Sequence, residues 1–278
     1  MPLKEKINEN IMRVIVCAAA AITSFIFLYI AGFILIRGIP NIKPSLFALV
    51  WTSENSSLTP ALVSTVILTF VSLLIAAPLG VFAAVWLAEY TRRTSKKSGA
   101  LIRITAETLA GIPSVVYGLF GLLFFVQFLG LGFSLISGAL TLSLMILPFI
   151  LRSTEEALRS VPDTWREGSF GLGAGKLRTV FKVVLPAAAP GVLAGIILSI
   201  GRIVAESAAL IYTAGTVAQI PKTPSQSVRT LAVHVYSLSS EGLHINEAYA
   251  TASVLLIVVV AINTIAAVLA KKIGGGLK

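Results

Sequence analysis

Two charged residues, Arg202 and Glu206, lie four positions apart in the apolar stretch "GRIVAESAALIYTAG". An ionised residue at the centre of a membrane helix costs about 2.5–3.5 kcal/mol on insertion scales, so it usually faces away from lipid and has a function. A guanidinium group suits an oxyanion better than a lysine does, because its planar fork donates two parallel hydrogen bonds. At this spacing both side chains share one face of a helix and can pair. We expect a path for an anion, with an interior salt bridge that fixes helix packing as the alternative.

A second group of informative residues is the glycine-rich, basic stretch "EGSFGLGAGKLRTVFKVVLP" at 167–186. Its "GLGAGK" does not match a phosphate-binding P-loop, because that pattern needs glycine at position 170 and a hydroxyl at 177, where Phe170 and Leu177 stand. A dinucleotide site needs a preceding strand, whereas the preceding segment is helical in pattern, with Ser153 and Glu156 as a capping box. The sequence therefore predicts no nucleotide site in this chain.

The same stretch fits two short helices and a turn. Asp163 is the expected N-cap of the first helix. Gly173 and Gly175 allow a turn with positive φ, and Pro186 is expected to end a second, basic amphipathic helix. Small residues beside exposed apolar ones suit docking into a groove of a partner. These residues are Gly168, Ser169, Phe170 and Leu172.

Both groups lie in a chain with the composition of an integral membrane protein. Only 12% of its residues are charged and 56% are apolar, with a mean hydropathy of +0.92, whereas soluble proteins have roughly 25% charged residues. A helix needs about 20 apolar residues to cross the hydrocarbon core, and six runs are long enough. They are residues 14–36, 60–88, 109–129, 131–151, 187–214 and 248–270.

Details of these runs refine the expected fold. The first run is longer than the ~7–15 apolar residues of a signal peptide, so we expect it to remain as a span. Glycines and Pro113 are expected to loosen the third run near one end. A short glycine-bearing link joins the third run to the fourth.

The basic residues predict the orientation of the spans. If alternate loops lie on one side, that side carries 17 of the 22 Lys and Arg residues, the opposite loops carry 4, and Arg202 is the last. The positive-inside rule then places residues 1–13, the 152–186 loop and residues 271–278 in the cytoplasm, with a permease domain at 14–270 in the cytoplasmic membrane. Topology thus accounts for the net charge of +10, and we expect no nucleic-acid partner.

The spacing at 167–186 resembles the EAA loop of ABC importer permeases, in which Glu-Ala-Ala, three residues, Gly and nine residues precede Ile-x-Leu-Pro. The matching positions begin at Glu167, Gly168 and Ser169, continue with Gly173 and end at Val183, Leu185 and Pro186. The resemblance implies an all-α, type I importer permease (MetI-like) fold with six transmembrane helices. It also implies that the EAA loop (residues 152–186) contains a coupling helix that inserts into a separate ATPase. The contact residues would be Glu167, Gly168, Ser169, Phe170, Leu172 and Gly173.

From Glu107 onward, "AGIPSVVYGLFG", the EAA loop and "GRIVAESA" resemble, in that order, the phosphate ABC transporter permeases PstA and PstC. The compact six-span form and "LAVHVY" are more like PstA, although Ser207 follows the glutamate where that family often has threonine. The resemblance implies phosphate as substrate and Arg202 and Glu206 on its path. It implies as partners a PstC-like permease, a PstB-like ATPase homodimer that uses ATP and Mg, and an extracytoplasmic PstS-like binding protein. The chain itself would bind no cofactor and have no enzymatic activity.

Other classes of function fit the sequence less well. A PstC-type role, or transport of sulfate or molybdate, is the nearest alternative. A secondary transporter would need intramembrane ion ligands or an internal repeat, and the sequence shows neither beyond Arg202 and Glu206. An intramembrane enzyme would need a second catalytic group at membrane depth, and the apolar runs contain no Asp or His. His234 and His244 lie in the last outside loop, whose segment 227–238 fits an amphipathic helix, and a metal site would need more ligands at closer spacing. We therefore predict neither a catalytic nor a metal site.

Overall fold

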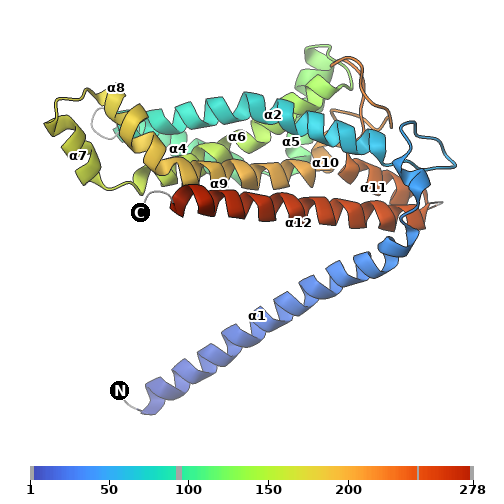
Figure 1. The fold of residues 1–278 in the computed structure, drawn as a ribbon, viewed down its shortest axis with the longest axis horizontal. Helices are drawn as coiled ribbons and strands as arrows, with labels where there is room; N and C mark the ends of the chain where they lie inside the picture. The colour runs from blue at the N-terminus through green and yellow to red at the C-terminus, as the bar shows by residue number, and fades with distance from the viewer. Residues whose placement is uncertain (1–2, 92–95, 243, 276–278) are drawn as a thin grey trace.

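The computed structural model describes residues 3–91, 96–242 and 244–275, and within them the regular structure is helical, with no strand. Four long helices lie side by side as a bundle (Figure 1). They are α2 (Thr59–Val85), α6 (Leu135–Arg159), α9 (Leu185–Val204) and α12 (Ile245–Gly275). This all-α architecture confirms the predicted fold class.

Helix α6 is the centre of the bundle. Its apolar residues Leu142, Ile146 and Ile150 recur every four positions and are completely buried between α2 and α9. Serines join α2 to α6 across this core, since the Ser72 hydroxyl donates to Ala139 O at 3.3 Å and the Ser143 hydroxyl donates to Ser72 O at 3.1 Å. Such short polar side chains let membrane helices approach closely and hydrogen bond in a solvent that cannot replace the bond.

Five helices in the described residues are long and apolar enough to span a membrane, and a sixth span exists if a bent pair counts as one. That pair is α4 (Lys96–Ala110) and α5 (Ser114–Gly121), the second continued by the π-helical η4 (Leu122–Phe128). The two halves are bent by 98°. The third span is thus not the single helix 109–129 that the sequence predicts.

The bend lies at Gly111–Pro113, where the sequence predicts a loosened helix. Pro113 has no N–H to donate, and it disfavours the helical conformation for the residue before it. The Tyr117 hydroxyl donates to Leu109 O at 2.8 Å, so one buried side chain bridges the break. After η4, the predicted glycine link is confirmed, because Gly130 and Gly132 both have positive φ and Ser134 then caps α6.

Two helix boundaries differ from the prediction. Helix α6 continues to Arg159, so Ser153 lies inside it and donates to Ile150 O instead of starting a capping box. Pro186 does not end a helix, because α8 (Lys176–Thr179), the π-helical η5 (Val180–Val184) and α9 form one continuous helix. The wider turn directly before Pro186 accommodates the missing N–H and the clash of the ring with the preceding turn.

The fifth span is also shorter than predicted. Helix α9 ends at Val204, ten residues before the predicted end at position 214, and a break at 205–207 leads into the one-turn α10 (Ala208–Ile211). The backbones of α5 and α10 approach closely at Gly118, because a Cβ on this residue would lie only 2.8 Å from Ala209 Cα. The two interrupted helices therefore pack directly against each other.

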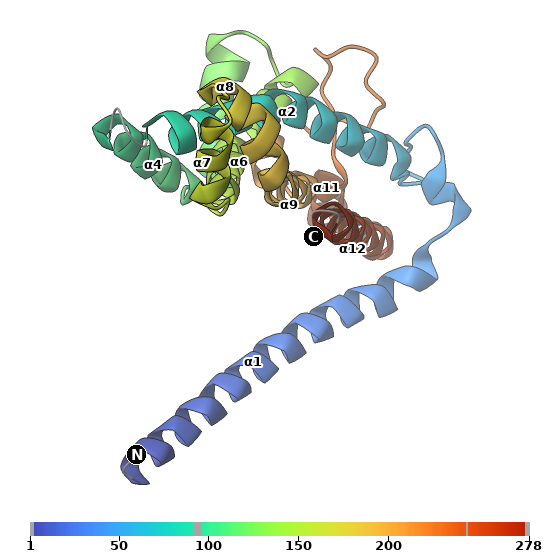
Figure 2. The same ribbon diagram turned by 60° about the vertical axis from the view of Figure 1, so that its left-hand side comes forward.

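The two ends of the bundle carry different elements (Figure 1). Helices α7 (Asp163–Gly171) and α8 lie at one end, where α12 also ends, while α11 (Leu231–Glu241) and the 212–230 loop lie at the other. The N-terminal end of helix α1 (Leu3–Gly38) lies away from the bundle, and the helix approaches the bundle toward its C-terminal end, as both views show (Figure 2). It meets α12 near its own end, where Ser253 donates to Ile34 O at 3.0 Å.

Candidate functional site: the EAA loop and the charged residues of the bundle

The EAA loop forms two arms with a tight turn between them. Helix α7 is the first arm, and α8 with η5 is the second. Gly173 has φ +80°, which confirms the predicted turn glycine, whereas Gly175 has φ −72° and needs no special conformation. The two arms are joined by a hydrogen bond of 2.9 Å between the hydroxyls of Ser169 and Thr179. This bond links the two arms close to the turn.

The tip of the loop is an exposed apolar knob. Leu172 is 92% exposed, and Phe170 is 47% exposed. Glu167 and Gly168 lie beside them, and no atom lies within 4 Å of a Cβ placed on Gly168. A small cleft at the turn is lined by Ser169, Leu172, Gly173, Ala174 and Arg178. All six predicted coupling residues thus lie together at one end of the molecule, where a partner could reach them.

The base of the loop contains a buried ion pair that the sequence analysis missed. Arg166 contacts Glu89 through Nη2 to Oε1 at 2.7 Å and Nε to Oε1 at 3.1 Å, and both side chains are over 90% buried. Asp163 is the first residue of α7 and pairs with Arg166 at 3.3 Å, so it is not the predicted N-cap. One feature of the sequence could have indicated this ion pair: Glu89 is the single acid in "WLAEYTRR", at a basic helix end.

Arg202 and Glu206 are not paired in the structure. Arg202 lies in the last turn of α9, is exposed, and has its guanidinium 5.5 Å from the centre of the Phe149 ring. Glu206 lies beyond the helix end, and its Oε1 accepts a hydrogen bond from Ala209 N at 3.1 Å. No ion pair joins these two described residues, because the helix that would place them on one face ends at Val204. The shared helix face expected from the i,i+4 spacing is therefore absent, and the alternative of an interior salt bridge loses its support.

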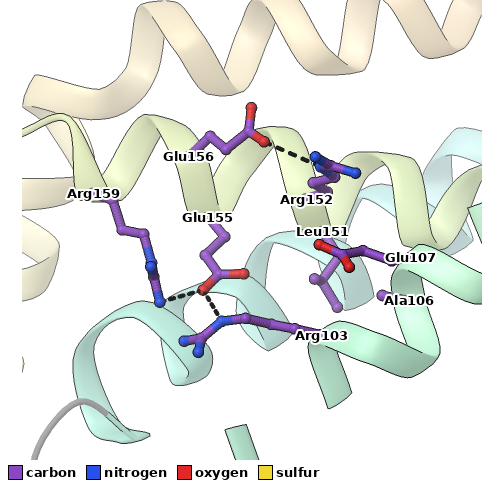
Figure 3. Close-up of a pocket in the computed structure, with 8 residues that line it drawn as sticks. All are labelled: Arg103, Ala106, Glu107, Leu151, Arg152, Glu155, Glu156 and Arg159. Atoms are coloured by element: carbon purple, nitrogen blue, oxygen red, sulfur yellow. Dashed lines mark hydrogen bonds and ion pairs between the residues drawn. The ribbon is translucent and has the colours of Figure 1, made fainter. Parts of the chain in front are cut away.

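A cleft of about 150 Å³ lies between α4 and α6 near the EAA loop (Figure 3). Glu155 accepts from Arg103 at 2.6 Å and pairs with Arg159 at 2.9 Å, while Arg152 pairs with Glu156 at 3.1 Å. With Glu107, three acids balance three arginines, so this cluster has no net charge that would attract an anion. Its evident effect is to join α4 to the end of α6.

The opposite end has a buried histidine in α11, the helix that the sequence predicts there. His234 Nδ1 lies 3.2 Å from Arg229 Nη1, and its Nε2 lies 3.3 Å from Ser56 O. Burial and the adjacent Arg229 lower the pKa of His234 to about 4, so it is neutral at pH 7. His244 instead lies 3.9 Å from Glu247. Among the described residues, no group of three His, Cys, Asp or Glu residues could hold a metal.

Known proteins resemble this chain in both sequence and fold. It is 33% identical over 259 residues to "Probable ABC transporter permease protein YqgI" of Bacillus subtilis, a match that covers 87% of this chain and 86% of that protein. It is 36% identical over 180 residues to "Phosphate transport system permease protein PstA" of Xylella fastidiosa, covering 64% of this chain and 62% of the relative.

Two solved structures share the fold. An alginate ABC transporter bound to its periplasmic protein matches 99% of both chains, with a TM-score of 0.70 at 16% identity. The methionine transporter MetNI matches 87% of this chain and 96% of the other, with a TM-score of 0.59 at 19% identity. These matches confirm the MetI-like permease fold. Residues 76–277 match the family described as "Binding-protein-dependent transport system inner membrane component", and the chain therefore belongs to this family of ABC transporter permeases.

Proposed function

We propose that the chain is the PstA-like permease subunit of an importer for inorganic phosphate. Its assignment as an ABC transporter permease follows from the family. The observation that carries the phosphate assignment is the similarity to PstA permeases, at 36% identity to that of Xylella fastidiosa and 41% over 156 residues to PstA 1 of Mycobacterium tuberculosis. A PstC-type role and transport of sulfate or molybdate are the alternatives, and competition for uptake separates the second of them from phosphate transport.

The EAA loop is the proposed contact with the ATPase. Leu172 and Phe170 expose apolar surface at the turn between the two arms, and an exposed apolar patch of this kind is typical of a docking surface. Arg178 and Lys182 add positive charge to the second arm. The ATPase would be a PstB-like homodimer that binds ATP and Mg, so that this chain neither binds nor hydrolyses the nucleotide.

The phosphate path would include Arg202 and Glu206. The Arg202 guanidinium is exposed and has no acidic partner among the described residues, so it remains available for an oxyanion. Glu206 can accept a hydrogen bond from a protonated phosphate, and it would repel sulfate, which carries no proton at neutral pH.

We infer further partners from the family and from apolar surface that the chain itself leaves uncovered. A PstC-like second permease would complete the translocation path, and lipid would surround both permeases. Helix α1 has an apolar window of which none is buried within the chain, so a second subunit or lipid must cover it. An extracytoplasmic PstS-like binding protein would meet the end that carries α11. We place the EAA loop and both termini in the cytoplasm from the charge asymmetry.

Reconstitution of the four-component complex in liposomes tests this proposal. The expected result is ATP-dependent uptake of radiolabelled phosphate that unlabelled phosphate inhibits and that sulfate and molybdate at the same concentration do not. Uptake inhibited equally by sulfate or molybdate would replace phosphate by a wider oxyanion class. Transport by the purified chain without an ATPase would contradict the proposed partnership as a whole.

A further inference from the structure

The EAA loop is attached by side chains to a helix that is distant from it in sequence. The flanking helices α6 and α9 continue directly into the loop, and they would be the default route for any movement of it. The loop also makes a buried ion pair and a cation–π contact with η3 (Trp86–Tyr90), the π-helical end of α2. These contacts indicate a third route through the bundle.

The first arm of the loop is held at Glu89. Arg166 precedes the first coupling residue, Glu167, and its guanidinium donates to Glu89 and to the carbonyls of Leu158 at 2.8 Å and Val161 at 2.7 Å. One buried side chain thus fixes α7 to the end of α6 and to η3 at once. A planar guanidinium with several directed donors makes such a junction rigid.

The second arm is held at the next residue of η3. Lys176 Nζ lies 4.3 Å from the centre of the Tyr90 ring, a cation–π contact between α8 and η3. Below it, Leu87 and Ala88 are buried in the same apolar cluster as Val180 and Val184 of η5. Both arms of the loop are therefore attached to a five-residue segment, Trp86–Tyr90.

Helix α2 and η3 connect this attachment to the opposite end of the bundle. Together they run without interruption from Thr59 to Tyr90, a length of about 48 Å at 1.5 Å per residue. Near the far end, the Thr65 hydroxyl accepts from Leu231 N of α11 at 2.9 Å, and the Ser64 hydroxyl donates to Gln219 O at 3.4 Å. One continuous helix thus contacts the EAA loop at one end and α11 at the other.

We infer that η3 receives the movement of the EAA loop, with Glu89 and Tyr90 as positioning residues, and that α2 carries this movement to the α11 end of the bundle. The inference rests on the proposed coupling of this chain to an ATPase. π-Helical turns occur often at functional sites, because the extra residue opens the helix locally and re-aims its side chains. Here the π turn directs consecutive residues, Glu89 and Tyr90, to different arms of one loop.

The test compares two variants with two matched controls in the reconstituted complex. Glu89→Gln removes the negative charge of the buried pair with Arg166 and keeps the shape of the side chain. Glu156→Gln makes the same change in the exposed pair with Arg152, which lies within one helix. Tyr90→Leu removes the ring under Lys176, whereas Tyr90→Phe keeps it. Uptake of radiolabelled phosphate and ATP hydrolysis are measured on the same liposomes, and the ATPase retained on purification is quantified.

We expect Glu89→Gln and Tyr90→Leu to retain the ATPase and its hydrolysis. Glu89→Gln should lower the phosphate imported per ATP roughly tenfold, as expected for loss of a charge-assisted contact, with a smaller fall for Tyr90→Leu. Both controls should keep the wild-type ratio. A wild-type ratio in both variants would overturn the inference, and so would loss of the bound ATPase, because the contacts would then only shape the loop. A wild-type chain that binds no ATPase would instead refute the proposed function.

Discussion

At the level of single residues, burial separates the charges that maintain the structure from those available to a ligand. Arg166 and Glu89 are buried and pair with each other, and removal of Arg166 would leave the Glu89 carboxylate as an isolated buried charge, a change that typically costs about 3–5 kcal/mol. Arg202 is exposed beside an aromatic ring, and Glu206 holds a backbone N–H with one oxygen. Arg202 and Glu206 therefore keep polar atoms that a ligand could contact, whereas Arg166 and Glu89 do not.

Glu206→Gln should give an assembled complex with phosphate uptake reduced about tenfold, since one charge-assisted hydrogen bond is worth about 1.5–3 kcal/mol. The amide oxygen can still accept from Ala209 N, so the turn into α10 should persist. Arg202→Lys should abolish most uptake because the planar fork is lost. Initial rates of radiolabelled phosphate uptake provide the measurement. Normal uptake in both variants at wild-type protein levels would remove this pair from the phosphate path.

His234 predicts a pH dependence of stability. Its pKa is about 4 in the folded protein, against an ordinary value of 6.5 for a solvated histidine, a difference worth about 3 kcal/mol. Because the unfolded chain takes up the proton first, this stability is complete above pH 6.5 and is lost as the pH falls toward 4.

The apparent melting temperature of the detergent-purified protein should therefore fall as the pH is lowered from neutrality toward the folded-state pKa of His234. The variant His234→Gln should show a weaker dependence over the same range, because it cannot take up a proton. An equal fall in variant and wild type would assign the effect to other groups.

At the level of elements, composition and periodicity predicted the spans well and their interruptions poorly. The apolar runs located the spanning helices, and Gly111 and Pro113 marked the bend. The sequence "VAESAA" at the end of α9 contains no helix-breaking residue, so the end at Val204 could not be predicted from it. We attribute the break to tertiary packing of α10 on α5. The Glu89 and Arg166 contact joins residues 77 positions apart, a pairing that a single sequence does not encode locally.

The turn of the EAA loop gives a prediction at this scale. Gly173 has φ +80° with open space around it, so a side chain there meets no neighbour but forces an unfavourable backbone conformation. Gly173→Val should distort the knob, at a cost of at least about 1–2 kcal/mol, and should reduce ATPase binding and coupled transport. Gly175→Val is the control, because Gly175 has negative φ and equally open surroundings. Equal ATPase retention on purification by both variants would show that the positive φ is not required.

At the level of the whole molecule, the two ends of the bundle carry different elements and therefore offer different surfaces to partners. One end carries the EAA loop with an exposed apolar knob, and it also carries the end of α12. The other end carries the 212–230 loop and α11, packed on the start of α2. Continuous helices join the ends, so an event at one end can alter the geometry of the other without local unfolding.

The orientation of these ends in the membrane is the last prediction. Lys176 and Lys222 are both exposed, and they lie in elements at opposite ends of the bundle. The excess of Lys and Arg on the EAA side predicts that Lys176 lies in the cytoplasm and Lys222 outside. In a Cys17→Ser background, Lys222→Cys should react with a membrane-impermeant maleimide in intact cells, and Lys176→Cys should react only after the membrane is opened. Labelling of position 176 but not 222 in intact cells would invert the topology. The knob of the EAA loop would then face away from any cytoplasmic ATPase, which is why this experiment tests the coupling proposal as well as the orientation.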